Sequence, residues 1–213
     1  MPIYQAPVRD TRYIIDAVLG LERYADLPIY QNATPALIEA VRGEAAKFCE
    51  EIVFPLNAGG DHEGCTRHED GSVTTPAGFR DAYAKLVEAG WPTLSGAPEY
   101  GGQGLPHLVA TAFEEYLTSA NMAFAMYPGL TMGAIGAITA KGSDAQKASY
   151  LPRMISGEWS GTMNLTEPHC GTDLGLIRTR AEPKGDGSYA ITGTKIFISA
   201  GEHDLTSNII HLV

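Results

Sequence analysis

The chain has 213 residues, of which 44% are apolar, and this length allows one large domain or two small ones. It carries 15 basic and 25 acidic residues, and the net charge of −10 argues against a nucleic-acid binder. Three cysteines do not make a disulfide framework, and neither a signal peptide nor an apolar run of roughly 20 residues is visible. We therefore expect a cytoplasmic protein that does not cross a membrane.

The first part of the chain shows helical periodicity. Apolar residues recur at spacings of three and four over residues 10–24 and again after Thr34. Thr34 is an expected N-cap, and Pro35 suits the first position of a helix. Pro55 and the Gly-Gly pair at 59–60 are expected to end this second helix.

Further helices are expected in four stretches, at 75–90, 105–125, 130–141 and 143–157. Thr75 and Ser143 are expected N-caps, and Ser143 forms a capping box with Gln146. Pro128 is expected to break the chain between the second and third of these helices. The stretch 130–141 is nearly uncharged, which indicates a buried helix.

At Trp159 the pattern changes from helix to strand. Short strands are expected at 159–165, 176–182, 189–192, 195–199 and 208–213. The third and fourth are expected to pair as a hairpin about Gly193. A few short strands do not easily close a core, and the last one runs to Val213 without a turn. We therefore expect the front part of a longer protein.

Two polar segments suggest binding sites. His62, Cys65 and His68 are spaced like metal ligands, but zinc sites usually have four well-placed ligands and no second pair follows, so a solvated loop is favoured and no metal site is predicted. The glycine-rich stretch 99–104 could cradle a phosphate. It does not follow a strand, however, and a tight connection between helices is the favoured interpretation.

The stretch 163–173, Met-Asn-Leu-Thr-Glu-Pro-His-Cys-Gly-Thr-Asp, lies where the helices give way to strands. The hydroxyls and backbone N–H groups of such a loop can converge on one polar, anionic ligand. His169 and Cys170 could suggest a catalytic pair, but adjacent residues on a turn seldom face each other, so this reading is not favoured.

Helices followed by Leu-Thr-Glu-Pro-x-x-Gly-Thr-Asp at 165–173 resemble the acyl-CoA dehydrogenase family. Further matching motifs are Tyr100–Gly104, Gln146–Pro152, Ser156–Glu158 and Lys195–Ser199. The resemblance covers residues 36–213. The extension before it, together with residues 167–173, looks most like the branch of the family that acts on 3-(methylthio)propionyl-CoA.

The resemblance implies an α+β fold in three parts: an N-terminal extension (1–35), an all-α helical bundle (36–158) and the beginning of an antiparallel β-barrel domain (159–213). The family's C-terminal helical domain is absent from this chain. The implied activity is that of an FAD enzyme, which removes a proton from Cα and a hydride from Cβ of an acyl-CoA thioester to give the 2,3-enoyl-CoA. Preorganised donors in a dry site would stabilise the developing enolate, and the redox chemistry belongs to the cofactor.

By the same resemblance, two segments would hold the flavin, through Met163, Leu165, Thr166, Gly171, Thr172, Phe197 and Ser199. Thr172 would also reach the CoA arm. Tyr127 and Met132 are candidates for the acyl pocket, with core packing as the open alternative. The family usually has Ser in place of Thr172 and often Trp in place of Phe197, so the hydroxyl and the stacking surface are kept while the indole N–H is lost.

No catalytic residue is assigned in this chain, because the family's catalytic base is a glutamate of the C-terminal domain. Glu167 is interpreted instead as a structural carboxylate that accepts loop N–H bonds. The 213 residues alone are therefore not expected to turn over substrate. An electron-transfer flavoprotein as electron acceptor and assembly as a homodimer or homotetramer are also implied. A helical interaction module without flavin, and a flavin oxidase or monooxygenase on the same scaffold, are the open alternatives.

Overall fold

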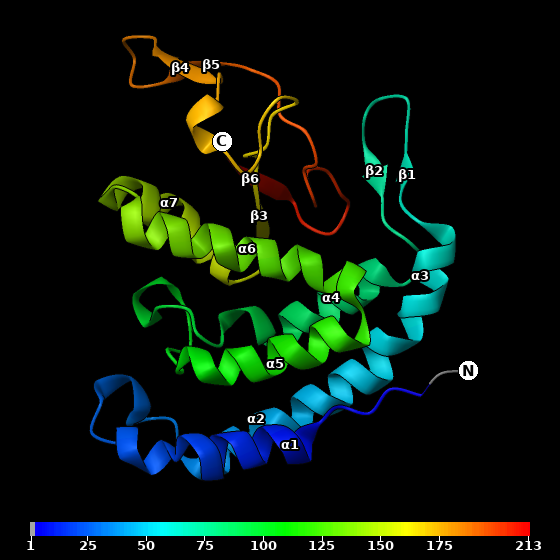
Figure 1. Cartoon of the computed structure of the whole chain (residues 1–213), viewed down its shortest axis with the longest axis vertical. Coiled ribbons are helices and arrows are strands. Elements are labelled where there is room, and N and C mark those ends of the chain that lie inside the picture. Colours follow the sequence, from blue (N-terminus) through cyan, green and yellow to red (C-terminus); the bar gives the residue numbers. More distant parts are fainter. Residues whose placement is uncertain (1–2) are drawn as a thin grey trace.

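The computed structural model describes residues 3–213. Its α-helices are α1 (Val8–Tyr13), α2 (Pro35–Phe48), α3 (Asn57–Glu63), α4 (Phe79–Glu88), α5 (His107–Ala120), α6 (Met122–Lys141) and α7 (Asp144–Ile155). Its strands are β1 (Thr66–Arg67), β2 (Val73–Thr74), β3 (Trp159–Met163), β4 (Arg180–Pro183), β5 (Tyr189–Thr192) and β6 (Asn208–Leu212). The helices lie in successive layers, with α1 and α2 at one side, α4 and α5 next to them, and α6 and α7 beyond; the strands β3 to β6 lie on the far side of α6 (Figure 1).

Two expected helix starts are confirmed. The Thr34 hydroxyl accepts a hydrogen bond from the N–H of Leu37 at 3.2 Å, at the start of α2. At the start of α7, the Ser143 hydroxyl accepts from the N–H of Gln146 at 3.3 Å, and the Gln146 side chain accepts from the N–H of Ser143 at 2.8 Å. Both caps satisfy backbone donors that the first turn of a helix leaves unpaired.

The prediction that Pro55 and the Gly-Gly pair after it end the second helix is wrong. A π-helical turn (Cys49–Val53) and a 3₁₀ turn (Phe54–Leu56) carry the chain from α2 into α3. Pro55 lies in the first turn of the 3₁₀ segment, where a proline does not interrupt the hydrogen bonding. Gly60 serves packing, because a Cβ atom there would come within 2.8 Å of the Phe79 ring.

The break that was expected at Pro128 lies at Asn121 instead. Asn121 has extended backbone (φ −160°), and its Oδ1 accepts from the N–H of Phe124 at 3.0 Å, so it ends α5 and caps α6. Pro128 lies inside α6. A proline inside a helix is costly by itself, so the packing of α6 against α5, α7 and β3 is what holds Pro128 within the helix.

The N-cap predicted at Thr75 is also wrong. Both the N–H and the hydroxyl of Thr75 donate to Asp204 Oδ1, at 3.0 and 2.7 Å. Helix α4 begins only at Phe79, after Gly78 in the left-handed region (φ 84°). Thr75 therefore joins the helical part to the segment that precedes β6.

The strands form pairs, and the described residues contain no closed barrel. β3 and β6 are parallel, with Trp159 opposite Asn208 and Met163 opposite Leu212, whereas an antiparallel arrangement was expected. A parallel pair needs a long crossover, and residues 164–207 provide it. These residues include the antiparallel pair β4–β5, while β1 and β2 form a separate antiparallel hairpin.

The expected hairpin between 189–192 and 195–199 does not form. β5 pairs with β4 instead, through a turn in which Ser188 donates from its N–H and hydroxyl to Asp186. The chain then leaves the sheet, because Phe197 has a left-handed backbone (φ 58°) that no strand contains. The strand expected at 176–182 begins only at Arg180, after a 3₁₀ turn.

Helix α6 lies between two apolar clusters. On one side, Trp91 stacks on Phe113 with ring centroids 4.5 Å apart, and Phe79 meets Phe124 edge-on at 5.5 Å. The smaller cluster on the other side contains Ala134, Ile138, Leu151, Met154 and Ile155. β3 approaches α6 so closely that a Cβ atom at Gly161 would come within 2.6 Å of the Ala134 side chain. This contact joins the strands to the helices.

Among the described residues, α6 is long and apolar enough to cross a bilayer by length and composition, so the expectation that no such run exists is wrong. Glycine, threonine and proline residues interrupt the apolar residues of α6, so the sequence contains no continuous apolar stretch of this length. In the structure 33% of the relevant window is buried, where α6 packs against α5, α7 and β3.

We predict that Asn121→Ala lowers the free energy of unfolding by about 1–2 kcal/mol, because the variant loses the cap of α6. Urea unfolding followed by circular dichroism measures the change. Ser143→Ala, which removes the exposed cap of α7, is the matched control and should cost about 0.5–1 kcal/mol. Equal stability of Asn121→Ala and the unaltered protein would contradict the role given to this cap.

Candidate functional site

The loop that follows β3 is closed by a tight turn. The N–H of Glu167 donates to the carbonyl of Cys170 at 2.8 Å, and the N–H of Cys170 donates back at 3.1 Å. Gly171 then passes close to Thr166, since a Cβ atom on the glycine would lie 3.1 Å from the threonine methyl group. The turn therefore brings Thr166 and Gly171, two residues of the predicted loop 163–173, together.

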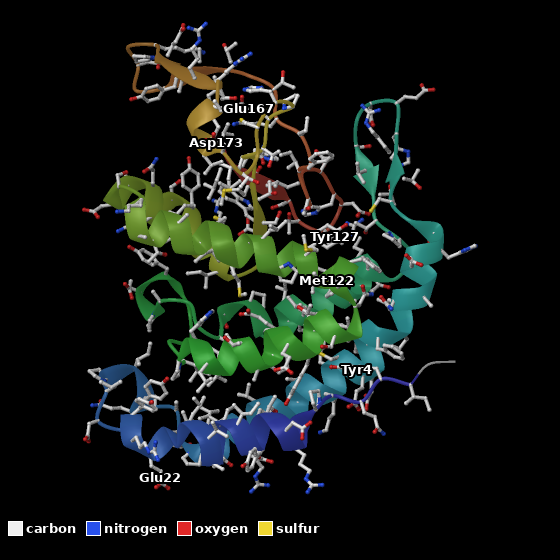
Figure 2. The ribbon with its side chains drawn as sticks, viewed as in Figure 1. Tyr4, Glu22, Met122, Tyr127, Glu167 and Asp173 are labelled. Atoms are coloured by element: carbon white, nitrogen blue, oxygen red, sulfur yellow. The ribbon has the colours of Figure 1, made fainter. Side chains whose placement is uncertain are left out.

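Glu167 is the centre of this loop. Its side chain is 3% exposed, and it accepts the N–H groups of Arg178 and Thr179, each at 2.9 Å. Lys195 Nζ lies 2.9 Å from Glu167 Oε1. Hydrogen bonds from Thr179, Arg178 and Lys195 hold the pKa of Glu167 well below its ordinary value. The interpretation of Glu167 as a structural carboxylate is confirmed, and Figure 2 shows it between the segments that it joins.

The segment 195–199 is fastened to the loop at several points. Besides its bond to Glu167, Lys195 Nζ donates to the carbonyl of Leu165 at 3.1 Å. The N–H of Ile196 donates to the carbonyl of Thr166 at 2.9 Å. At the far end, the Thr162 hydroxyl on β3 donates to the carbonyl of Ser199 at 2.6 Å. The two segments that the resemblance assigns to the flavin thus lie side by side without forming a sheet.

Between these attachments the side chain of Phe197 is 87% exposed. Phe197 has a positive φ, a backbone conformation that a residue other than glycine adopts only when its surroundings hold it there. Met163, at the end of β3, is 46% exposed. Leu165, Thr166 and Gly171 are half-buried, and Thr172 and Ser199 are exposed. The structure therefore brings the seven predicted cofactor residues into one region.

The two predicted acyl-pocket residues face different surroundings. Tyr127 is buried, its hydroxyl lies 3.7 Å from Cys65 Sγ, and its ring meets the His203 ring edge-on at 5.1 Å. Burial raises the pKa of Tyr127. Met132 is half-buried, one helical turn further along α6, and lines a small cavity of about 80 Å³ beside Trp91. Both assignments stay predictions.

The sequence analysis missed His203, which is 4% exposed. Its Nδ1 accepts from the N–H of Leu205 at 3.2 Å, so the proton lies on Nε2 and is donated to Ser160 Oγ at 3.0 Å. Burial lowers the pKa of His203, which favours this neutral form. With Asp204 bound to Thr75, this residue holds the loop before β6 against the helices. No sequence signal links partners so far apart in the chain.

Several side chains of the two cysteine-histidine motifs have partners within the protein. His68 Nε2 pairs with Thr74 at 2.8 Å, and Cys65 contacts Tyr127. Glu167, His169 and Cys170 do lie close enough to share an ion. However, His169 Nε2 faces the carbonyl of Leu176 at 2.9 Å, so it carries a proton, and Glu167 is already hydrogen-bonded to three donors.

Comparison with known proteins gives consistent matches. Residues 37–158 match the family model described as acyl-CoA dehydrogenase, N-terminal domain. The chain is 49% identical over 210 residues to 3-methylmercaptopropionyl-CoA dehydrogenase of Ruegeria pomeroyi, covering 99% of this chain and 36% of that protein. It is 34% identical over 215 residues to a butyryl-CoA dehydrogenase of Syntrophomonas wolfei, covering 99% and 35%. The chain thus spans about a third of the length of these relatives.

Solved structures show the same likeness. Butyryl-CoA dehydrogenase from Megasphaera elsdenii has a TM-score of 0.65 and 26% identity, over 77% of this chain and 41% of that one. A structure described as the electron transferring flavoprotein of Acidaminococcus fermentans also has a TM-score of 0.65, with 28% identity, over 77% of this chain and 40% of that one.

We predict that Glu167→Gln lowers the thermal midpoint at pH 7, because the neutral amide cannot pair with Lys195 or accept all three donors. The folded-state pKa of Glu167 lies below its ordinary value of 4.5, so its stabilisation is complete above that pH and is lost as the pH falls below it. Thermal unfolding from pH 7 down to about pH 2 should therefore show a difference between the two proteins that is constant above pH 4.5 and shrinks below it. Glu182→Gln, on the exposed strand β4, is the control. A difference that stays constant with pH would contradict the role of the charge.

Proposed function

The chain belongs to the acyl-CoA dehydrogenase family, and from this premise we propose that it is the N-terminal part of an FAD-dependent enzyme that oxidises an acyl-CoA thioester to the 2,3-enoyl-CoA. The observation that carries the proposal is the attachment of residues 195–199 to the loop 163–173. Glu167, Lys195 and the bond from Ile196 to Thr166 fasten the two segments that the family resemblance assigns to the cofactor.

The side chains of this region suit a flat apolar ring with a charged tail. Phe197 and Met163 both expose apolar side chains, which suit contact with a flat ring. The hydroxyls of Thr166 and Thr172 are donors for polar edges and phosphate oxygens, and Gly171 lets the backbone approach closely. Ser199 closes the region beside β3. These residues fit the isoalloxazine ring and the pyrophosphate of FAD.

In this proposal FAD supplies the hydride acceptor when it is bound. The chain's own residues would position the cofactor and shield it from water. Glu167 fixes the loop by neutralising Lys195, and Phe197 covers one side of the ring and keeps water away from it. Thr166 holds a donor at the ring edge, where preorganised dipoles stabilise developing charge. The base that takes the Cα proton is assigned to the C-terminal part of the enzyme, and no residue of this chain takes that role.

For the substrate we propose 3-(methylthio)propionyl-CoA. The support is the 49% identity to a 3-methylmercaptopropionyl-CoA dehydrogenase over almost the whole chain, compared with 34% to a butyryl-CoA dehydrogenase. Thr172 would reach the CoA arm, and Tyr127 and Met132 would border the acyl group. We further propose an electron-transfer flavoprotein as electron acceptor, a cytoplasmic location, and assembly as a homodimer or homotetramer. Support for the acceptor is the structural likeness to a chain whose description names an electron transferring flavoprotein.

We predict that the whole protein is purified with FAD, visible as flavin absorbance. Anaerobic addition of 3-(methylthio)propionyl-CoA should bleach this absorbance faster than addition of butyryl-CoA. A colourless protein that FAD does not reconstitute would contradict the cofactor assignment. Bleaching by butyryl-CoA alone would overturn the substrate and leave the reaction class in place.

We predict that Phe197→Ala weakens FAD binding by about threefold to tenfold, the worth of one aromatic contact. Fluorescence titration of the deflavinated whole protein with FAD measures the change. Tyr189→Ala is the matched control, because Tyr189 is also an exposed aromatic residue (59%) but lies on β5. Equal affinities of the two variants would contradict the place given to Phe197.

A further inference from the structure

The N-terminal segment 3–33 is attached to the helical bundle by one of its sides. The Tyr4 hydroxyl donates to the carbonyl of Tyr116 on α5 at 3.0 Å. Further along the segment, Thr11 and Ile15 are buried and lie one helical turn apart. The segment is thus anchored to the bundle, and it lies across the helical layers from the strands β3 to β6 (Figure 1).

The other side of this segment exposes large apolar side chains. Helix α1 continues into a π-helical turn (Ile14–Leu19), and on these two elements Tyr13, Ile14 and Val18 are 65%, 47% and 55% exposed. Among the described residues 16 large apolar side chains are exposed, and eight of them lie within residues 3–37. Half of this surface is therefore concentrated in a small part of the chain, which is typical of an interaction surface. We call Tyr13, Ile14 and Val18 the N-terminal apolar face.

The charges near this face do not favour a charged partner. Residues 1–33 carry three arginines and four acidic residues, so the segment is close to neutral. Arg12 and Asp16 lie on the same helical stretch and pair with each other at 3.4 Å. An anionic membrane surface or a nucleic acid is usually met by a basic face. Exposed apolar side chains with balanced charges around them suit contact with another protein surface.

The N-terminal segment is an addition to the family fold, because the match to the family model begins only at residue 37. In the Ruegeria pomeroyi protein, which matches 99% of this chain, the 210 matched residues make up 36% of the length. In the isovaleryl-CoA dehydrogenase of Bos taurus, which matches 58% of this chain, 128 matched residues make up 29% of the length. The first protein is therefore the longer one. A match that includes the N-terminal segment thus goes together with additional chain outside the matched region.

We propose that the N-terminal apolar face is covered by the part of the same polypeptide that follows Val213, through a segment that the shorter relatives lack. The contact would bury Tyr13, Ile14 and Val18 and join the first and last parts of the enzyme. Burial of apolar surface stabilises such a contact, and a partner on the same chain is present at a high effective concentration. The inference rests on the proposal that this chain is the N-terminal part of a longer enzyme.

The test uses Tyr13→p-benzoylphenylalanine in the whole protein, which places a photoreactive ring of similar shape on the face. Irradiation followed by mass spectrometry should give a cross-link to a peptide that follows Val213. On a denaturing gel the cross-linked product should keep the mass of one polypeptide, because a cross-link between two copies would double it. Glu69→p-benzoylphenylalanine, at an exposed residue between β1 and β2, is the control and should give no cross-link to that peptide.

Two further variants test the apolar contact itself, each combined with the photoreactive residue at position 13. Ile14→Asp would bury a charge in the contact, so the yield of the cross-link should fall by about tenfold or more. Ile14→Leu keeps an apolar side chain of the same size and should keep the yield. Flavin absorbance should be unchanged in both variants, because the face lies across the helical layers from the loop 163–173 (Figure 1).

The outcomes separate this inference from the proposed function. A protein that binds FAD but gives only cross-links of doubled mass, or no cross-link at position 13, would overturn the inference and leave the proposed function in place. An unchanged cross-link yield in Ile14→Asp would also overturn it. A protein that gives the expected cross-link but does not bind FAD would support the contact and overturn the proposed function.

Discussion

The arrangement of the candidate site depends on one buried carboxylate. Glu167 collects two backbone N–H groups and one ammonium group from segments that lie 11 to 28 residues further along the chain. Each donor alone would leave part of the carboxylate unsatisfied in a buried place. Together they compensate its desolvation and fix three loops at once. No sheet joins these loops among the described residues. The hydrogen bonds to Glu167 therefore hold the loops together, as backbone hydrogen bonds between strands do in a sheet.

The helices provide the base on which this loop system rests. β3 packs directly on α6, and the N–H of Gly161 donates to the Thr131 hydroxyl at 3.1 Å, so the start of the loop has a fixed origin. Asp204 fastens the returning chain to Thr75, which precedes α4, and His203 contacts Tyr127 on α6, before the chain pairs with β3 as β6. The crossover that carries the site therefore begins and ends at two strands that are paired with each other. Close packing at Gly161 also explains why the small side chain of Ala134 stands opposite it on α6.

The sequence indicated those features that depend on neighbouring residues. The caps at Thr34 and Ser143 are local and were predicted correctly, as was the α+β class, and the motif at 165–173 pointed to the family. The errors concern features decided at a distance. Thr75 has the form of an N-cap, but its donors are taken by Asp204, which is 129 residues away. The segment 195–199 has strand composition, but Lys195 and Ile196 are bound to the loop and β5 already has a partner.

Two buried charges, Glu167 and Arg42, are compensated by the described residues to different degrees. Glu167 and Arg42 are equally hidden from solvent, each with 3% of its side chain exposed. Glu167 accepts hydrogen bonds from two backbone N–H groups and from Lys195, so the chain itself compensates its burial. Arg42 retains two buried donors with no partner among the described residues. Since desolvation penalises both ions alike, the difference lies in what compensates it, and for Arg42 the remaining compensation has to come from outside these residues.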